Sequence, residues 1–186
     1  MRIIGLSGKM GVGKDFIASN IIQKYFDKIG KKSLIMAFAD QLKVNTSIKN
    51  NININEMYNT KNEKIRKLLQ QEGTLNGRMK YGENIWINYI DNWINIYKDR
   101  GIEVVIITDC RFKNEIEYIE SKNGIVLRIE ANDRNKERIH KENNNKLIVN
   151  HESEIGLDNY NFKNVIYNEK NSKNVENQVI NYLKLL

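Results

Sequence analysis

Short apolar runs alternate with longer amphipathic stretches along the chain, and this alternation predicts a sheet covered by helices. Runs with the length of buried strands occupy residues 2–7, 33–38, 103–108, 124–130 and 163–167. Strands of a parallel sheet read as nearly continuous apolar runs, because helices cover both faces. We therefore predict an α/β fold, a three-layer sandwich around a five-stranded parallel sheet.

The stretches between the runs carry apolar residues at helical spacing. After the first run, Ile17, Ile21 and Tyr25 fall on one line of a helix, and Gly30 is a natural end for it. Together with its two flanking runs, this helix predicts a βαβ unit with a right-handed crossover. Further helices are predicted near residues 65–73, ending close to Gly73, and at 112–121 and 172–186, where Leu186 would point inward.

Residues 39–100 carry no strand pattern. The strongest helical pattern of the chain, residues 82–97, lies here: apolar and aromatic pairs recur every four residues, and Gly101 follows. Trp86 and Trp93 belong to this pattern. Either tryptophan could stack on a ligand, but the periodicity favours packing in the core.

Residues 131–150 are highly charged, rich in Asn and without a clear core face. Such a composition predicts an exposed and mobile segment. It is either a solvated run of charge or a lid that closes over phosphates. In the second case Arg134 and Arg138, with His140 nearby, would neutralise charge on a transferring phosphoryl group.

Composition indicates a soluble globular domain spanning residues 1–186, with 40% hydrophobic and 28% charged residues. No apolar stretch approaches the ~20 residues that span a bilayer, and the N-terminus lacks the pattern of a signal peptide. Cys110 is the only cysteine, so no internal disulfide can form. We expect a cytoplasmic protein, in the host cytoplasm if it is viral, that does not bind a membrane.

The net charge of +7 favours anionic partners, either nucleic acid or small molecules rich in phosphate. The basic residues are scattered, and no run of five or six occurs. No aromatic residues are interleaved with them in the manner of a nucleic-acid platform. We therefore expect small-molecule nucleotide substrates and no stable nucleic-acid complex. The sequence leaves a monomer or a homodimer open.

The loop after the first apolar run has the spacing of a phosphate-binding loop, G-x-x-x-x-G-K, from Gly8 to Lys14. Glycines let backbone N–H groups converge on phosphate oxygens, and the helix that follows adds its positive end. Asp15 stands where Ser or Thr usually contacts Mg²⁺. An ordinary glycine-containing turn is the alternative. We predict an ATP site, with Lys14 exposed in the loop, formed by Gly8, Lys9, Gly11, Val12, Gly13, Lys14 and Asp15.

Asp109 follows the third apolar run and supplies the expected second half of this site. A carboxylate there can hold Mg²⁺ beside the phosphates, directly or through water. It could also be only the N-cap of the next helix. Arg111 lies two residues further on and is placed to reach a phosphate.

Several motifs, in order, resemble those of the deoxynucleoside monophosphate kinases of phages and large DNA viruses, and more distantly those of animal phosphomevalonate kinases. They are Gly13-Lys14-Asp15, Phe38 to Lys43, Arg66 to Gln70 with Gly73-Thr74, Gly77-Arg78 and Trp86, Thr108 to Glu115, His151 to Glu154, and Val165 to Asn168. Gln41 and Lys113 stand where the family pattern has Pro. Residues 152–160 look closer to the phosphomevalonate kinase version.

The resemblance implies a nucleoside-monophosphate-kinase-like fold with an acceptor-binding region near 39–100 and a lid near 131–150. The reaction would transfer the γ-phosphoryl group of ATP to a deoxynucleoside monophosphate. Asp15 and Asp109 would hold Mg²⁺, Lys14, Arg111, Arg134 and Arg138 would act in transfer, and Asn168 would lie near the adenine. The implied acceptor-binding residues are Asp40, Lys43, Arg66, Gln70, Thr74, Arg78, Trp86 and Arg111.

Three alternatives stay open. A phosphomevalonate-type kinase would share the mechanism and differ in its acceptor. A non-enzymatic nucleotide-binding module would bind without turnover, and the arginine-rich segment counts against it. A nucleic-acid-binding protein would show affinity that falls steeply with salt, and the absence of a basic patch counts against that.

Overall fold

The computed structural model describes residues 1–58, 62–131, 133, 151–169 and 174–185. The chain forms two compact units, one made of Met1–Met36 with Tyr97–Leu186 and the other of Ala37–Ile96. Each unit is described by itself. Within the described residues no helix is both long enough and apolar enough to cross a membrane.

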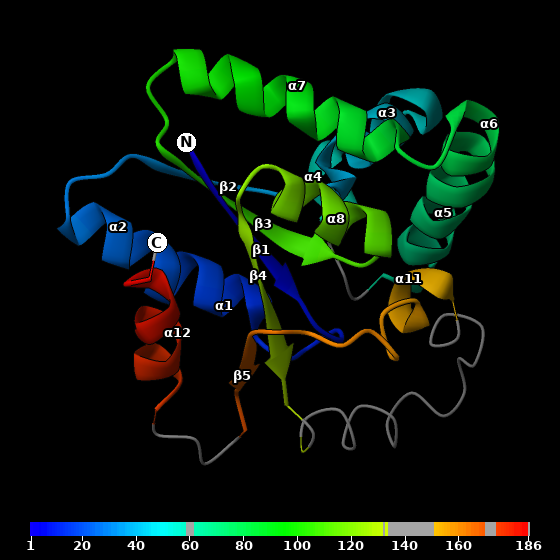
Figure 1. Cartoon of the computed structure of the whole chain (residues 1–186). Coiled ribbons are helices and arrows are strands. Elements are labelled where there is room, and N and C mark those ends of the chain that lie inside the picture. Colours follow the sequence, from blue (N-terminus) through cyan, green and yellow to red (C-terminus); the bar gives the residue numbers. More distant parts are fainter. Residues whose placement is uncertain (59–61, 132, 134–150, 170–173, 186) are drawn as a thin grey trace. The chain divides into compact units, whose positions relative to one another are not determined.

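The first unit is built on the predicted five-stranded parallel sheet, in the order β2-β3-β1-β4-β5 (Figure 1). Its strands are β1 (Arg2–Ser7), β2 (Ser33–Met36), β3 (Val104–Cys110), β4 (Ile125–Glu130) and β5 (Val165–Tyr167). The first strand is central and pairs in parallel with β3 on one side and β4 on the other. The loop that follows β1 therefore emerges from the middle of the sheet.

Helices cover both faces of this sheet, which gives the three layers expected from the sequence. One face is covered by a continuous helix and by α12 (Val175–Leu183). The continuous helix comprises α1 (Lys14–Ile17), the π-helical η1 (Ala18–Gln23) and α2 (Lys24–Lys28). Ile4, Leu6 and Phe26 are fully buried in the core between these layers. On the other face, α8 (Lys113–Ser121) packs against β1 and β4.

Some predicted boundaries are corrected. The second strand ends at Met36 and not at 38, and β3 runs on to Cys110, so that Asp109 lies inside the strand. The last helix ends at Leu183, and Leu186 lies outside the described residues. Nearly all of the charged segment 131–150 also lies outside them; its first residue, Ala131, is buried rather than exposed.

The second unit is helical, and its described residues contain no strand, as expected. Its elements are α3 (Ala39–Asn50), α4 (Ile54–Met57), α5 (Glu63–Gly73), the π-helical η2 (Thr74–Arg78), α6 (Met79–Tyr81) and α7 (Ile85–Asp99), of which residues up to Ile96 belong here.

The helix predicted to end near Gly73 instead continues through η2 and α6. Gly73 is buried, and a Cβ on it would lie 2.9 Å from the side chain of Leu42 in α3. This glycine therefore permits close packing between helices and does not stop the helix. Gly77 serves in the same way, because a Cβ there would lie 2.5 Å from the ring of Trp86.

The two tryptophans of α7 differ. Trp86 is buried, its Nε1 donates to the carbonyl oxygen of Gly73 at 3.1 Å, and its ring stacks on Tyr89. The prediction of core packing is confirmed for Trp86. It is wrong for Trp93, which is 40% exposed and whose Nε1 donates to Oε1 of Gln41. Helical periodicity identifies which side of a helix faces the core, but it does not show how far neighbouring elements cover the residues at the edges of that side.

Candidate phosphate-binding site

The loop between β1 and α1 has the backbone that a phosphate-binding loop requires. Gly8 has φ +146°, and a Cβ on it would lie 2.5 Å from the carbonyl oxygen of Ile129. Gly13 has φ 93° immediately before the first turn of α1. Only glycine adopts these conformations without strain. Val12, between them, is fully buried and anchors the loop to the core.

Asn168, which follows β5, holds this loop from the side. Its side chain is buried, and its Nδ2 donates to the carbonyl oxygen of Val12 at 2.8 Å. The family resemblance implies that Asn168 lies near the adenine of ATP. The contact seen in the structure is with the phosphate loop itself.

Lys14 is partly buried rather than exposed as we expected. Its Nζ donates to the carbonyl oxygens of Gly8 at 2.7 Å and Lys9 at 2.9 Å, so the side chain is folded back over its own loop. These two carbonyls satisfy the ammonium group. A phosphate oxygen would have to replace them.

Burial lowers the pKa of Lys14 from 10.5 to about 8. Burial is the largest cause of this net shift, and the positive charge of Arg111 acts in the same direction. The carboxylates of Glu154, Asp15 and Asp109 oppose it. The site therefore holds a lysine whose charged form is poorly solvated and gains from an incoming anion.

Asp109 lies near the carboxyl end of β3, which neighbours β1 in the sheet. The N-cap of α8 is Phe112, so Asp109 does not cap that helix. Asp15 is exposed in the first turn of α1. The charges of both carboxylates act on Lys14.

No cluster of three or more acidic, His or Cys ligands occurs among the described residues. Two carboxylates fit Mg²⁺, which takes its other ligands from phosphates and water.

Arg111 is held by two carboxylates that our sequence analysis did not single out. Its Nη1 donates to Oε1 of Glu154 at 2.5 Å and to the carbonyl oxygen of Ser153 at 3.0 Å. Its backbone N–H donates at 2.7 Å to Oε2 of Glu115, which is 2% exposed and also accepts from the N–H of Phe112. Burial alone would lower the pKa of Arg111, but Glu154 and the other nearby carboxylates raise it above its ordinary value.

Lys9, in the loop, is engaged by the same segment as Arg111. Its Nζ donates to the carbonyl oxygen of Glu154 at 2.6 Å and pairs with the carboxylate of Asp158. Two of the predicted phosphate-binding cations thus contact a single stretch of chain, residues 153–158.

Arg128 is a further cation beside the loop that sequence reasoning missed. It is buried in β4, where its Nε donates to Oε1 of Glu130 at 2.7 Å and its Nη1 to Oγ of Ser7 at 3.3 Å. Ser7 immediately precedes Gly8. An arginine inside the apolar run 124–130 was the available signal, because a charge in a buried strand needs a partner.

In the second unit, the structure brings together Asp40, Lys43 and Tyr58. The carboxylate of Asp40 accepts from the backbone N–H of Ala37 at 2.8 Å and from the hydroxyl of Tyr58 at 3.0 Å. Nζ of Lys43 lies 3.6 Å from that carboxylate and 4.0 Å from the centroid of the Tyr58 ring. The hydroxyl, the ring and the two charges therefore form one fixed group.

The other predicted acceptor residues follow the helix from α5 into η2. Arg66, Gln70, Thr74 and Arg78 recur every four residues, and the first three share one side of the helix. Nη1 of Arg78 donates to the carbonyl oxygen of Glu83. Trp86 is buried against Gly77, as described above. Arg134, Arg138 and His140 lie outside the described residues, so their predicted role as a lid stays a prediction.

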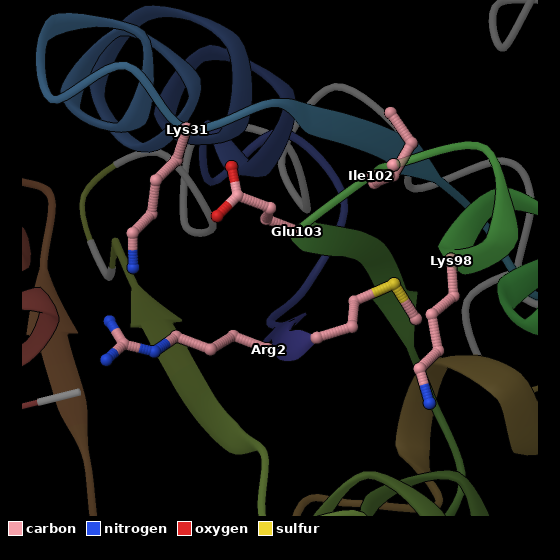
Figure 2. A pocket seen from close by; sticks show the side chains of 7 residues that line it. Arg2, Lys31, Lys98, Ile102 and Glu103 are labelled. Atoms are coloured by element: carbon pink, nitrogen blue, oxygen red, sulfur yellow. The ribbon is translucent and has the colours of Figure 1, made fainter.

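A cavity of about 330 Å³ lies at the opposite end of the strands from the phosphate loop and is a separate feature (Figure 2). It opens where β1 and β3 begin, whereas the phosphate loop leaves the end of β1. Its lining consists of Met1, Arg2, Lys31, Lys98, Gly101, Ile102 and Glu103. Ligands of open parallel sheets bind at the carboxyl ends of the strands, so we place the reaction at the loop.

Fold and site together define a P-loop kinase, with a phosphate loop after the central strand of a parallel sheet and a carboxylate on the neighbouring strand. The family model of phosphomevalonate kinase matches residues 6–124, more than half of the chain. The chain belongs to this family and is an ATP-dependent kinase.

Solved structures agree with this fold. That of TT1252 from Thermus thermophilus matches with a TM-score of 0.58 at 14% identity, covering 99% of this chain and 96% of that one. An unliganded sugar kinase from Janibacter sp. matches with a TM-score of 0.51 at 14% identity, covering 99% and 95%. At such identity they show the fold alone. No curated protein matches the sequence significantly.

Proposed function

We propose that this protein is a deoxynucleoside monophosphate kinase, which transfers the γ-phosphoryl group of ATP to a deoxynucleoside monophosphate and releases ADP and the diphosphate. The observation that supports a nucleotide acceptor is the group formed by Asp40, Lys43 and Tyr58. It combines an aromatic ring that is 50% exposed, a fixed carboxylate that can accept from a base, and a cation for phosphate. Gln70 and Thr74 add neutral groups that pair with base edges.

On this proposal the loop amides and Lys14 hold the phosphates of ATP, and Lys14 exchanges the carbonyls of Gly8 and Lys9 for phosphate oxygens. Arg111 meets the acceptor or transferring phosphate. Asp15 and Asp109 hold Mg²⁺, which neutralises charge on the phosphates when it is bound. Phosphoryl transfer asks for little covalent chemistry from the protein, so positioning and charge neutralisation supply most of the rate.

A phosphomevalonate-type kinase is the second candidate, and the family model over residues 6–124 favours it. The phosphate loop, Asp109 and Arg111 would serve either acceptor equally. The difference lies in the second unit: phosphomevalonate carries a carboxylate, which the fixed carboxylate of Asp40 would repel. A base instead gains hydrogen bonds from the same group, and a site built for such bonds rejects an acceptor that lacks them.

The test is a coupled ADP-release assay with each deoxynucleoside and ribonucleoside monophosphate and with phosphomevalonate, side by side. We expect one or more deoxynucleoside monophosphates to give the highest kcat/KM. A higher kcat/KM for phosphomevalonate than for every nucleotide would overturn the proposed acceptor and leave the kinase assignment standing.

Asp40→Asn then tests the acceptor group itself. The amide fits the same space but loses the charge, so we expect the KM for the nucleotide acceptor to rise at least about tenfold while the KM for ATP stays within about twofold. Asn45→Asp, on an exposed position of the same helix, is the control for altered charge on α3. An unchanged acceptor KM in Asp40→Asn would remove Asp40 from the site.

A further inference from the structure

Glu154 is a buried carboxylate to which neither the sequence nor the proposed function assigns a task. It belongs to the short helix α11 (Glu152–Ile155), and its side chain is only 6% exposed. Its Oε1 accepts from Nη1 of Arg111 at 2.5 Å. Burying a carboxylate is unfavourable unless a charged partner with good geometry compensates it, and Arg111 is that partner.

The helix that carries Glu154 is itself held in place. His151 caps it: Nδ1 accepts from the backbone N–H of Ser153 at 3.2 Å and lies 2.9 Å from Oγ of the same residue. The carbonyl of Ser153 in turn accepts from Nη1 of Arg111. Gly156 closes the helix, where a Cβ would lie 2.8 Å from the carbonyl oxygen of Glu152 and 3.5 Å from that of Arg111. The motif from His151 to Glu154 therefore forms a hydrogen-bonded support beside Arg111.

Among the described residues, the guanidinium of Arg111 makes its hydrogen bonds to α11 from one edge. Both of its bonds to this helix are made by Nη1, whereas Nη2 and Nε carry three more N–H groups. Its side chain keeps 32% exposure although its partner Glu154 is buried. Meanwhile Glu115 fixes the backbone N–H of Arg111 from α8. An arginine held by one edge is suited to present its other edge to a phosphate.

We infer that Glu154 is a positioning residue for phosphoryl transfer: it fixes one edge of the Arg111 guanidinium so that the remaining N–H groups meet the same phosphate oxygens in every turnover. The inference rests on the proposed phosphoryl transfer but not on the choice of acceptor. It assigns the motif from His151 to Glu154 to the support of Arg111 and not to contact with the nucleotide.

The kinetic test compares Glu154→Gln with Glu152→Gln, which removes the same charge from an exposed position in the same helix. The assay uses the acceptor with the highest kcat/KM, phosphomevalonate included. We expect kcat of Glu154→Gln to fall about 10- to 100-fold, as for a misplaced catalytic group, with KM values within about threefold. Glu152→Gln should stay within about twofold of the wild type. A kcat of Glu154→Gln within about twofold of the wild type would overturn the inference.

A double-mutant cycle separates positioning from a purely structural role. If Glu154 acts through Arg111, adding Glu154→Gln to Arg111→Lys should cause little further loss of kcat, because the residue it positions is already altered. A structural role predicts instead that the two losses multiply and that Tm falls with them. Multiplying losses would therefore contradict the inference.

A measurement on the folded protein makes the test independent of turnover. In ¹⁵N-arginine-labelled protein, the guanidinium signals of Arg111, assigned through Arg111→Lys, should show restricted rotation in the wild type and in Glu152→Gln. Glu154→Gln should release that rotation. Equal restriction in Glu154→Gln and the wild type would show that Glu154 does not hold the guanidinium. Absence of phosphoryl transfer in the wild type, with restriction lost in Glu154→Gln, would overturn the proposed function and leave standing only the hold of Glu154 on the guanidinium.

Discussion

Lys14 is partly buried by the fold, and on the proposed function the reaction also needs its positive charge. The carbonyls of Gly8 and Lys9 satisfy its ammonium group, and burial lowers its pKa to about 8. The charged form is thus retained near neutral pH but is not strongly stabilised. A bound phosphate would stabilise the charged form further.

Replacing Lys14 by Ala should abolish phosphoryl transfer while the protein remains folded. Removal of one preorganised charge from such a site lowers kcat by at least ~10²-fold. The ADP-release assay measures the loss, and circular dichroism and Tm report the fold. Lys24→Ala, on an exposed residue of α2, is the control and should leave kcat unchanged. Near-normal activity in a folded Lys14→Ala protein would refute the phosphate-loop assignment.

The lowered pKa of Lys14 predicts proton uptake on nucleotide binding. The phosphates favour the charged ammonium, so the pKa rises in the complex, and affinity falls as pH rises above about 8. For folding the sign is opposite: the buried charge disfavours the folded state below about 8, and this penalty is relieved as pH rises toward 10.5. Calorimetry of ADP binding at pH 8.5 in buffers of different ionisation enthalpy measures the uptake. A binding enthalpy independent of the buffer would contradict it.

Among single residues, the sequence can single out those whose expected role depends on their position next to a strand or a loop. The sequence singles out Lys14, Asp109 and Arg111 by their spacing from apolar runs. The structure places Asp109 inside β3, and the charges of Asp109 and Arg111 act on Lys14. The sequence does not identify Glu115 and Glu154 as partners of Arg111, because it does not show whether an acidic side chain is solvated or buried. Which of the two it is depends on contacts between distant parts of the chain, and for Glu154 the separation from Arg111 is 43 residues.

At the level of helices and strands, the phosphate loop lies between β1 and α1 but is also held by the residue that follows β5. Asn168, at the end of β5, donates to the carbonyl of Val12 in the loop. The loop is therefore tied to the core by a buried hydrophobic side chain and by a hydrogen bond from the sheet's edge strand.

Asn168→Ala decides between a loop-supporting role and contact with adenine. Loss of the buried hydrogen bond should lower the free energy of unfolding by about 1–3 kcal/mol, measured by denaturant titration. If Asn168 supports the loop, affinity for ATP and for inorganic triphosphate should weaken by the same factor. Asn164→Ala is the matched control, since its Nδ2 donates to the carbonyl of Val126, away from the loop. Weaker ATP binding with unchanged triphosphate binding would indicate adenine contact instead.

Most helices and strands can be predicted from the sequence, and the mispredicted boundaries show which information the sequence lacks. Central strands such as β1 and β3 are covered on both faces, so their apolar runs mark them within two residues. The end of α5 was mispredicted because Gly73 is ambiguous: the same residue stops a helix or lets two helices approach. Only the position of Leu42 decides between these, and no local pattern contains it.

For the whole molecule, the fold class follows from the alternation of strands and helices, whereas the acceptor does not follow from the fold. The phosphate loop serves any kinase of this architecture, and function depends on the site that the fold carries. The family model confirms kinship with phosphomevalonate kinases, the more distant of the two resemblances read from the motifs. On the proposed function, the choice of acceptor depends on a few side chains of the second unit, above all Asp40 and Tyr58.

Transfer of label from [γ-³²P]ATP is the most direct test of the central claim that the loop from Gly8 to Lys14 transfers phosphoryl groups to a phosphate acceptor. The protein is incubated with labelled ATP, Mg²⁺ and pooled deoxynucleoside monophosphates, and the products are separated by chromatography. We predict that label appears in a deoxynucleoside diphosphate with the wild type and not with Lys14→Ala. Label that stays in ATP, or that is released as inorganic phosphate equally with and without acceptor, both in this incubation and in a parallel one with phosphomevalonate, would contradict the account.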